Sequence, residues 1–390
     1  MGRRTWQQST LAGIHDTLRG QVDYGYDAEG RLLKHYEARQ GHASRGFRYD
    51  AADNLVDEEQ GSVAVRDNRL RQWQQLFMKY DAWGNLIRRR SGQYEQHFTW
   101  DAENRLITAS GSGPQGRFTA HYHYDVLGRR TRKVVNSGQG EQETRFLWQG
   151  YRLLQEQQAN GSRQTYVYDP AETWTPLARI DHQQDAAQGE IFWFSTDLNG
   201  APLEVTDAEG AVRWSGQYGS FGEVSRQTEG FYRLSGLTSL HHQPLRYAGQ
   251  YADRETGLHY NLFRYYDPQV GWFTVQDPAG LAGGWNLYQY APNPLGWIDP
   301  FGLSFIDIIG DAAQKTGRKY QGAEIYKVSS KVKVGDVTFK NGDYFYIDNL
   351  HKDHYETFSS LDKSKGVFNL DGSYNERKSA KATKRKGPGC

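Results

Sequence analysis

The chain has few of the residues that cross-link a protein or anchor it in a membrane. Among its 390 residues there is one cysteine, Cys390, at the last position. No internal disulfide can form, so the fold must depend on the burial of side chains. The first 21 residues contain no secretory signal, and no apolar run reaches the roughly 18 residues that a membrane helix needs. If the protein leaves its cell, we expect another machine or polypeptide to carry it.

Glycine and aromatic residues are abundant instead. The sequence contains 43 Gly, 26 Tyr and 11 Trp. This composition favours short strands, tight turns and aromatic faces, and it is unlike that of disordered chains. The length is more than one ordinary domain usually holds, so we expect two folded units of mainly β structure.

Charge is distributed unevenly between the two parts of the chain. Residues 304–390 contain 16 Lys and Arg against 11 Asp and Glu, a net charge of +5. The rest contains 31 against 35, a net charge of −4. A basic end on an acidic body indicates that this end meets a polyanion.

A short pattern recurs along the body: an aromatic residue, Tyr or Trp, then Asp, a Gly or Asn, and Leu. The first five Asp residues of the pattern are 23, 31, 20 and 24 residues apart. Each unit fits two short strands and two turns, because Asp bonds its own backbone and Gly or Asn accepts a positive φ. Stacked units would bury a continuous aromatic face. Copies lie at 24–32, 47–55, 80–86, 98–106 and 123–129, with weaker ones at 166–169 and 207–210.

This repeat resembles the Rhs/YD-repeat family of polymorphic toxins, over roughly residues 20–303. The resemblance implies an antiparallel β-shell that encloses a toxin. The repeats here are fewer than the family usually has, so we expect a partial cocoon. The alternative is an unrelated β-sandwich or propeller with similar turns. The expected regions are a shell at 1–244, the end of the shell core at 245–303, and a toxin domain at 304–390.

Two Asp-Pro-x-Gly motifs lie near the end of the shell region, with 18 residues between them, at Asp277 and Asp299. Physically each is a turn in which Pro fixes φ and Gly takes the strained position. In the Rhs family such motifs form an intramolecular aspartyl protease. The resemblance implies that Asp277 and Asp299 activate water between them and cut the bond Leu303–Ser304.

The basic end changes character, because the repeat stops and lysine becomes frequent. We expect a short helix at 305–316 and a hairpin turn at Asn341–Gly342. The tail at 376–386 fits one or two helical turns. Together these elements predict a small α+β domain with a twisted antiparallel sheet. Strands are expected at 324–328, 331–334, 337–339, 344–348, 354–358 and 366–370.

Two imidazoles and several carboxylates lie close together in this domain. His351 and His354 stand within nine residues that also contain Asp348, Asp353 and Glu356. Such a cluster beside a basic tail suits RNA cleavage without a metal, which needs a base, an acid and a cation for the phosphate charge. Two alternatives are a zinc site at His-x-x-His, which lacks a clear third ligand, and a polar strand face without a chemical role.

The end domain resembles the colicin/cloacin ribonucleases that cleave ribosomal RNA, over about residues 325–386. The resemblance implies that Glu356 is the general base and His351 the general acid. Asp348 would orient the imidazole and Arg385, or alternatively Arg377, would stabilise phosphate charge. The phosphate-binding lysines would be Lys378, Lys381, Lys384 and Lys386.

The spacing of this match departs from the family in one respect. Glu356 follows His351 by five residues, one more than the family has, so a regular strand places the two side chains on opposite faces. A β-bulge near Asp353 would restore the match. Otherwise His354, which shares a face with Glu356, is the working imidazole.

The sequence therefore predicts an antibacterial effector that needs no cofactor or metal. Its expected partners are ribosomal RNA in the small subunit, a small acidic immunity protein and a secretion-system carrier. It would be made in the bacterial cytoplasm and delivered into a target cell. The competing hypotheses are a non-enzymatic shell and a metal-dependent nuclease toxin.

Overall fold

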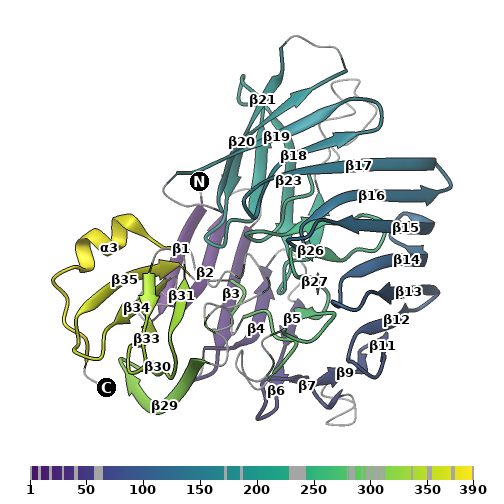
Figure 1. Ribbon diagram of the computed structural model, residues 1–390. Helices are drawn as coiled ribbons and strands as arrows, with labels where there is room; N and C mark the ends of the chain where they lie inside the picture. Colours follow the sequence, from purple (N-terminus) through teal and green to yellow (C-terminus); the bar gives the residue numbers. More distant parts are fainter. Residues whose placement is uncertain are drawn as a thin grey trace.

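The fold is described from a computed structural model. It describes residues 2–7, 10–16, 20–28, 30–38, 43–56, 65–170, 174–184, 188–227, 243–278, 280, 286–291, 293–295, 299, 302, 309, 312–334, 337–348, 354–369 and 374–388. Antiparallel strands dominate these residues, which confirms the mainly β prediction (Figure 1).

The repeat region forms long runs of hydrogen-bonded strands in sequence order. A five-stranded sheet comes first, with β1 (Gly2–Gln7), β2 (Thr10–Asp16), β3 (Gly20–Tyr26), β4 (Leu32–Glu37) and β5 (Ala43–Gly46). Two strand pairs follow, β6 (Arg48–Tyr49) with β7 (Leu55–Val56) and β8 (Val65–Arg66) with β9 (Arg69–Leu70). A sheet of 15 strands comes next, with β10 (Gln72–Trp73), β11 (Leu76–Tyr80), β12 (Leu86–Ser91), β13 (Tyr94–Trp100), β14 (Leu106–Gly113), β15 (Gly116–Tyr124), β16 (Arg130–Ser137), β17 (Gly140–Gln149), β18 (Arg152–Gln158), β19 (Arg163–Tyr168), β20 (Pro176–His182), β21 (Glu190–Thr196), β22 (Pro202–Thr206), β23 (Val212–Tyr218) and β24 (Val224–Gln227).

Each repeat makes the turn that its Asp predicts. At Asp125 one carboxylate oxygen accepts the backbone N–H of Arg129 at 2.9 Å, and the other accepts Arg129 Nε at 2.8 Å. Gly128 has φ 78°, the left-handed conformation that the fourth position of the turn requires. The equivalent position is left-handed in the other copies too, at Gly30, Asp53, Gly84 and Asn104.

At seven of the described turns, the aromatic residue that precedes the turn connects its repeat to an earlier one. Tyr124 donates its hydroxyl hydrogen to the carbonyl of Leu106 at 2.8 Å, and Trp148 donates Nε1–H to that of Arg130 at 2.7 Å. The same bond satisfies a polar tip that is otherwise surrounded by apolar side chains, so the rings can stay buried. Further members of this ladder are Tyr26 to Leu11, Tyr49 to Leu32, Trp100 to Leu86, Tyr168 to Leu153 and Tyr218 to Pro202.

The segment that follows the long sheet packs against its inner face. It contains a four-stranded sheet, and one hydrophobic core runs from Leu32 to Leu295, through both predicted shell regions. Strand β23 and the turn that follows it also contact the first sheet, where Gln217 bonds Glu37 and Glu223 pairs with Arg45. The strands of the segment are β25 (Tyr251–Ala252), β26 (His259–Asn261), β27 (Arg264–Asp267) and β28 (Trp272–Phe273).

Buried charges join the inner segment to the wall. Arg130 on β16 and Asp253 on the segment are both fully buried and meet at 2.6 Å. Lys133 reaches the same Asp253 at 2.9 Å and Glu255 at 3.1 Å. Each charge therefore has a partner, which a buried ion must have if the fold is to tolerate it.

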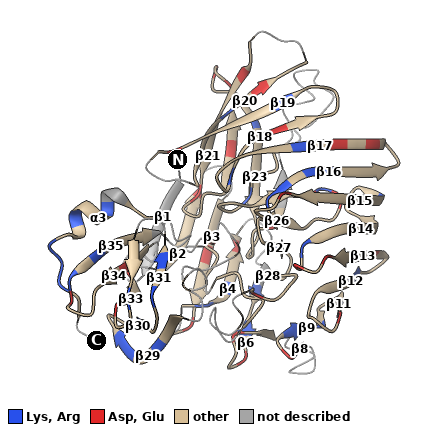
Figure 2. Cartoon of the chain, in the orientation of Figure 1, with Lys and Arg blue, Asp and Glu red and all other residues tan. Residues whose placement is uncertain are grey.

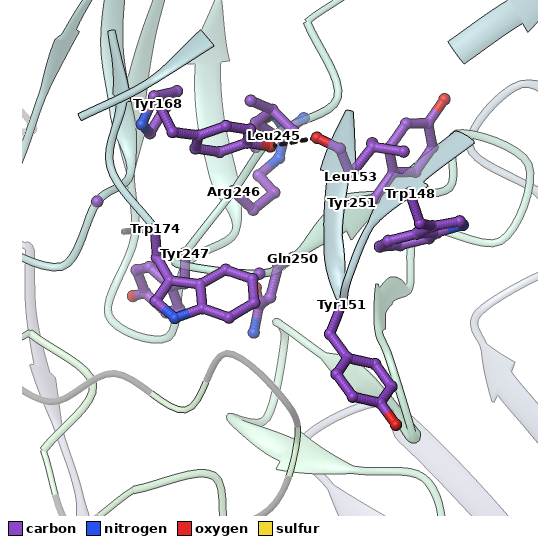
Figure 3. Close-up of a pocket in the computed structure, with 13 residues that line it drawn as sticks. Trp148, Tyr151, Leu153, Tyr168, Trp174, Leu245, Arg246, Tyr247, Gln250 and Tyr251 are labelled. Atoms are coloured by element: carbon purple, nitrogen blue, oxygen red, sulfur yellow. Dashed lines mark hydrogen bonds between the residues drawn. The ribbon is translucent and has the colours of Figure 1, made fainter. Parts of the chain in front are cut away.

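Packing at this contact is close. Figure 3 shows Trp148, Leu153 and Tyr168 of the wall facing Leu245 and Tyr251 of the inner segment. The cavity between them is about 20 Å³, about the room that a single water needs. It is therefore a packing defect and has no room for a ligand.

The C-terminal region forms a separate sheet with cores of its own. The strand order is β29-β30-β33-β34-β35, with β31 and β32 as a second pair. Its elements are β29 (Ala313–Tyr320), β30 (Ala323–Val328), β31 (Val332–Val334), β32 (Val337–Phe339), β33 (Tyr344–Ile347), β34 (His354–Phe358), β35 (Ser364–Asn369) and helix α3 (Glu376–Ala382).

Two local predictions in this region are only partly met. Of the helix expected at 305–316, Ile309 is helical, residues 313–316 belong to strand β29, which pairs with β30 from Ala313 onward, and residues 305–308, 310 and 311 lie outside the described residues. The turn at Asn341–Gly342 forms, but it does not make a hairpin, because β33 pairs with β30 and β34 and not with the preceding β32. Tertiary pairing overrides the local signal at 313–316 and at this turn.

No helix within the described ranges is long and apolar enough to cross a membrane.

Substitutions of two arginines on strand β16 test how much the buried ion pair contributes to the free energy of unfolding. Arg130→Met leaves Asp253 buried with one partner fewer, and we expect a loss of about 3 kcal/mol in the free energy of unfolding. Arg132→Met removes an ion pair with Glu143 in which Arg132 is 43% exposed, and should leave the free energy of unfolding almost unchanged because solvent screens exposed pairs. Urea unfolding followed by tryptophan fluorescence measures both. Equal losses would show that the ion pair does not hold the inner segment.

Candidate functional site

The structure brings the two predicted junction aspartates to one guanidinium. Arg264 Nη2 lies 3.0 Å from Asp277 Oδ2 and 3.6 Å from Asp299 Oδ2. Arg264 is 2% exposed and its guanidinium lies 3.7 Å from the centre of the Phe273 ring. The sequence pattern indicated the two aspartates but missed Arg264, which stands on β27 outside both motifs.

The backbone after Asp299 is held in the same place. Asn261 Nδ2 donates to the carbonyl of Asp299 at 2.9 Å, and Arg264 Nε donates to that of Gly302. Gly302 has φ 66°, and a Cβ there would lie 3.0 Å from the carbonyl oxygen of Asn261. Only glycine fits this turn without displacement. The predicted scissile bond Leu303–Ser304 lies outside the described residues.

In the C-terminal sheet, strand β34 carries the second candidate site. It lies between β33 and β35, with Glu356 opposite Tyr346 and Val367. His354 and Glu356 alternate onto one face of the strand and are 3% and 2% exposed. The other face, with Tyr355, belongs to the hydrophobic core.

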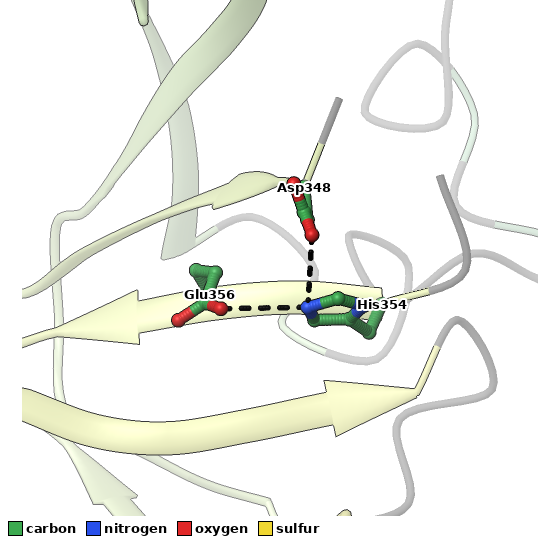
Figure 4. Close-up of side chains that lie close together, drawn as sticks. All are labelled: Asp348, His354 and Glu356. Atoms are coloured by element: carbon green, nitrogen blue, oxygen red, sulfur yellow. Dashed lines mark hydrogen bonds and ion pairs between the residues drawn. The ribbon is translucent and has the colours of Figure 1, made fainter. Parts of the chain in front are cut away.

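Asp348, His354 and Glu356 meet on this face (Figure 4). His354 Nε2 lies 3.3 Å from Asp348 Oδ2 and 3.4 Å from Glu356 Oε1. Asp348 follows the end of β33, and its backbone N–H donates to the carbonyl of His354 at 2.9 Å. That bond continues the sheet by one residue and fixes where the Asp348 side chain begins.

Two cations complete the cluster. Arg385 Nη1 binds Glu356 Oε1, and Lys378 Nζ lies 3.0 Å from His354 Nδ1. Helix α3 carries Lys378, and the helix begins at Asn375, which caps it by accepting the N–H of Lys378. The tail that carries Arg385 is held where Gly387 donates to the carbonyl of Asp362 at 3.0 Å. The cluster thus holds two carboxylates and two cations around one imidazole.

The two carboxylate oxygens of Glu356 differ in their contacts. Its Oε2 is buried and has no hydrogen-bond partner among the described residues, which is uncommon for a buried polar atom. The neighbouring Tyr346 shows how apolar the surroundings are: burial, and secondly the charge of Glu356, raise the pKa of its hydroxyl above the usual value. An unpaired carboxylate oxygen in such surroundings can accept a proton from a ligand.

The remaining predicted residues are placed as follows. Lys381, Lys384 and Lys386 are exposed on α3 and the tail (Figure 2). Strand β29, which the sequence analysis missed, adds further exposed basic residues. His351, Asp353 and the side chain of Arg377 lie outside the described residues.

The three acidic and imidazole groups satisfy the simplest test for a metal site. One ligand atom from each of Asp348, His354 and Glu356 lies within 4.8 Å of the others. The residues nevertheless suit a metal poorly, because Arg385 already occupies Glu356 Oε1 and Lys378 stands at the other nitrogen of His354. A divalent cation would meet two positive charges at close range.

A hollow of about 630 Å³ lies in the shell and is lined by charged side chains of both signs, among them Lys133, Glu143, Asp181 and Glu255.

Repeated turns, a curved wall of antiparallel strands and a packed inner segment define this chain as a YD-repeat shell protein. Residues 1–294 match the family model described as Teneurin YD-shell. The chain belongs to the YD-shell family. The match ends before the C-terminal sheet.

Individual proteins agree with this placement. Double-stranded DNA deaminase toxin A of Burkholderia cenocepacia is 43% identical over 317 residues, which cover 75% of this chain and 22% of that protein. Toxin protein Tse5 of Pseudomonas aeruginosa is 32% identical over 356 residues, covering 75% and 26%. The chain thus spans about a quarter of the length of these relatives. The solved structure of TcdB2-TccC3-TEV is 18% identical with a TM-score of 0.47, covering 77% of this chain and 18% of that one.

Two buried carboxylates of the C-terminal sheet should respond differently to mutation. Asp343 binds Lys365 Nζ at 2.6 Å and the N–H of Lys340 at 2.8 Å, so Asp343→Ala leaves a cation and a donor unpaired. We expect it to cost about 3 kcal/mol of unfolding free energy. Glu356→Gln should cost less than about 1 kcal/mol, because Arg385 is 54% exposed and can turn to water. A larger loss for Glu356→Gln would mark it as a structural residue.

Proposed function

We propose that this chain is part of a polymorphic toxin whose C-terminal region cuts RNA by acid–base chemistry without a metal. The observation that carries the proposal is the free Oε2 of Glu356, buried beside an imidazole and two cations. Such a set supplies a base, an acid and positive charge within one site.

The reaction follows from these groups. Glu356 takes the proton of a ribose 2′-hydroxyl, and the freed oxygen attacks the neighbouring phosphorus. The P–O bond to the next nucleotide breaks, and its 5′ oxygen receives a proton from His354. The products are a 2′,3′-cyclic phosphate and a 5′-hydroxyl. Asp348 holds the imidazole and Arg385 stabilises the charge on phosphate.

In this proposal His354 takes the role that the family resemblance gave to His351. It lies on the same strand face as Glu356, and its ring nitrogen faces both carboxylates. His351 and Asp353 then have no part in the chemistry. The exposed Lys381, Lys384 and Lys386 would contact phosphates, and ribosomal RNA in the small subunit is the proposed target.

DNA deamination is the second candidate, because a relative carries that name. Zinc deaminases hold their metal with a His and two Cys, or three Cys, beside a catalytic Glu. This chain has a single cysteine, so it cannot assemble that ligand set. A different toxin domain on a similar shell accounts for the different names.

The proposal extends to the partners. A small acidic immunity protein would cover the basic face of α3 and the tail and so protect the producing cell. A secretion-system carrier would deliver the toxin from the bacterial cytoplasm where it is made to the cytoplasm of a target cell.

We also propose that Asp277 and Asp299 cut the chain after Leu303 and free the region 304–390. The support is their shared position at Arg264, together with the fixed carbonyl of Gly302. The cut would detach the toxin domain from the shell.

If the chain cuts itself after Leu303, a purified sample should contain two fragments. The purified wild-type chain should separate on denaturing gels into pieces that begin at Met1 and Ser304, and Asp299→Asn should stay whole because it loses one of the two carboxylates. Asp23→Asn is the control, since this aspartate bonds the exposed side chain of Gln21 on β3 and lies outside both the pair and the inner segment. A wild-type chain that stays intact under native conditions would contradict the proposal.

If His354 is the imidazole that takes part in the reaction, toxicity should depend on His354 and not on His351. When the full-length chain is expressed from an inducible promoter in a bacterium, His354→Ala and Glu356→Gln should abolish growth arrest. Each removes an acid–base partner that supplies about 10²–10⁴-fold in rate. His351→Ala should remain toxic, and circular dichroism should show all three variants folded. If only His351→Ala loses toxicity, the family position was correct and His354 is structural.

A further inference from the structure

We propose that Lys378 is a positioning residue that fixes the tautomer of His354, and not one of the RNA-binding lysines. The proposal rests on the proposed function, because it concerns the imidazole of that site. The sequence places Lys378 in a run of basic residues, and nothing in that run separates it from Lys381.

The contact with His354 distinguishes Lys378 from Lys381. Lys378 Nζ lies 3.0 Å from His354 Nδ1, and His354 is 3% exposed. Lys381 points to solvent from the same helix. Lys378 starts in the first turn of α3, directly bonded to the cap Asn375, so its direction is set by the cap and by the packing of α3 on β35.

Hydrogen-bond chemistry then decides where the imidazole proton lies. A lysine ammonium has three donors and no acceptor, so the Nδ1 that faces it must accept. A neutral imidazole with Nδ1 as acceptor carries its proton on Nε2. Nε2 is the nitrogen 3.3 Å from Asp348 and 3.4 Å from Glu356. Both carboxylates accept, so the three contacts agree on one tautomer.

This tautomer is the one that the proposed reaction needs. The proton on Nε2 is inside the cluster, where it can pass to the leaving 5′ oxygen. As it leaves, Nδ1 takes a proton from the Lys378 ammonium, so that the imidazole stays neutral and Lys378 becomes an amine. Glu356, which now holds the 2′-hydroxyl proton and lies 3.4 Å from Nε2, then passes a proton to Nε2, and Nδ1 returns its proton to the Lys378 amine, so that all three groups regain their starting states.

The test compares Lys378→Met with Lys381→Met in the full chain. Met keeps the length of the lysine stem and removes the donor. Long-range proton–nitrogen NMR spectra of the ¹⁵N-histidine-labelled chain report the tautomer of each of the 12 histidines, and His354→Gln assigns the signal. We expect the Nε2–H tautomer in the wild type and in Lys381→Met, and a mixture of tautomers in Lys378→Met. Lys378→Arg, which can still donate, should restore the single tautomer.

RNA cleavage provides the second readout. Lys378→Met should lower kcat about 10–100-fold, the range for outer contacts that orient a reacting side chain, with KM nearly unchanged. Lys381→Met should raise KM and keep kcat. A single Nε2–H tautomer in Lys378→Met, with no second tautomer, overturns the assignment, and so does a pure KM effect. If the chain cuts no RNA but the tautomer changes as described, the proposed function fails and the role of Lys378 stands.

Discussion

The structure depends on one hydrogen-bonded turn that is repeated along the wall. In the first five copies an Asp carboxylate accepts the backbone N–H four residues on, and a left-handed residue before that N–H completes the turn. The turn places the preceding aromatic ring so that its polar tip reaches a carbonyl of an earlier repeat. Neighbouring strands are thus held at their ends as well as along their ladders, which lets a long sheet keep its order.

The wall in turn determines the site at the junction. Its inner face accepts the segment from Leu245 to Leu295 through aromatic packing and the buried charges at Asp253. That segment contains Arg264, whose guanidinium forms ion pairs with both Asp277 and Asp299. The carboxylates that are proposed to release the C-terminal region are therefore positioned by the packed shell. A loosened inner segment would separate them.

The sequence predicted features that depend on local patterns. The repeat turns follow from Asp, Gly and Asn at fixed spacing, and strand 354–358 follows from its alternation. The alternation of side chains along a strand also predicted that His354 and Glu356 lie on the same face. Long-range features were beyond it: no local pattern indicates that Arg264 lies between the two aspartates or that Lys378 faces His354. Strand β29 was missed because its exposed, polar residues are ordered by pairing with β30 and not by burial.

The side chains gathered in the C-terminal region suit a different chemistry from the one that the name of a relative states. A shell of similar sequence belongs to a protein named as a DNA deaminase, whereas the groups gathered here, Glu356, His354 and Arg385, suit transfer of the 2′-hydroxyl proton of RNA. DNA lacks the 2′-hydroxyl, so the proposed cleavage can act on RNA and not on DNA. The choice of substrate therefore distinguishes RNA cleavage from DNA deamination.

The most direct measurement is incubation of the purified chain with ribosomes, naked RNA and DNA in excess chelator, followed by gel electrophoresis and analysis of the new ends. The account predicts RNA fragments that end in 2′,3′-cyclic phosphate, no change in DNA, and no fragments from Glu356→Gln. Cleavage that stops in chelator and returns with zinc or magnesium, or modification of DNA in place of RNA, would contradict it.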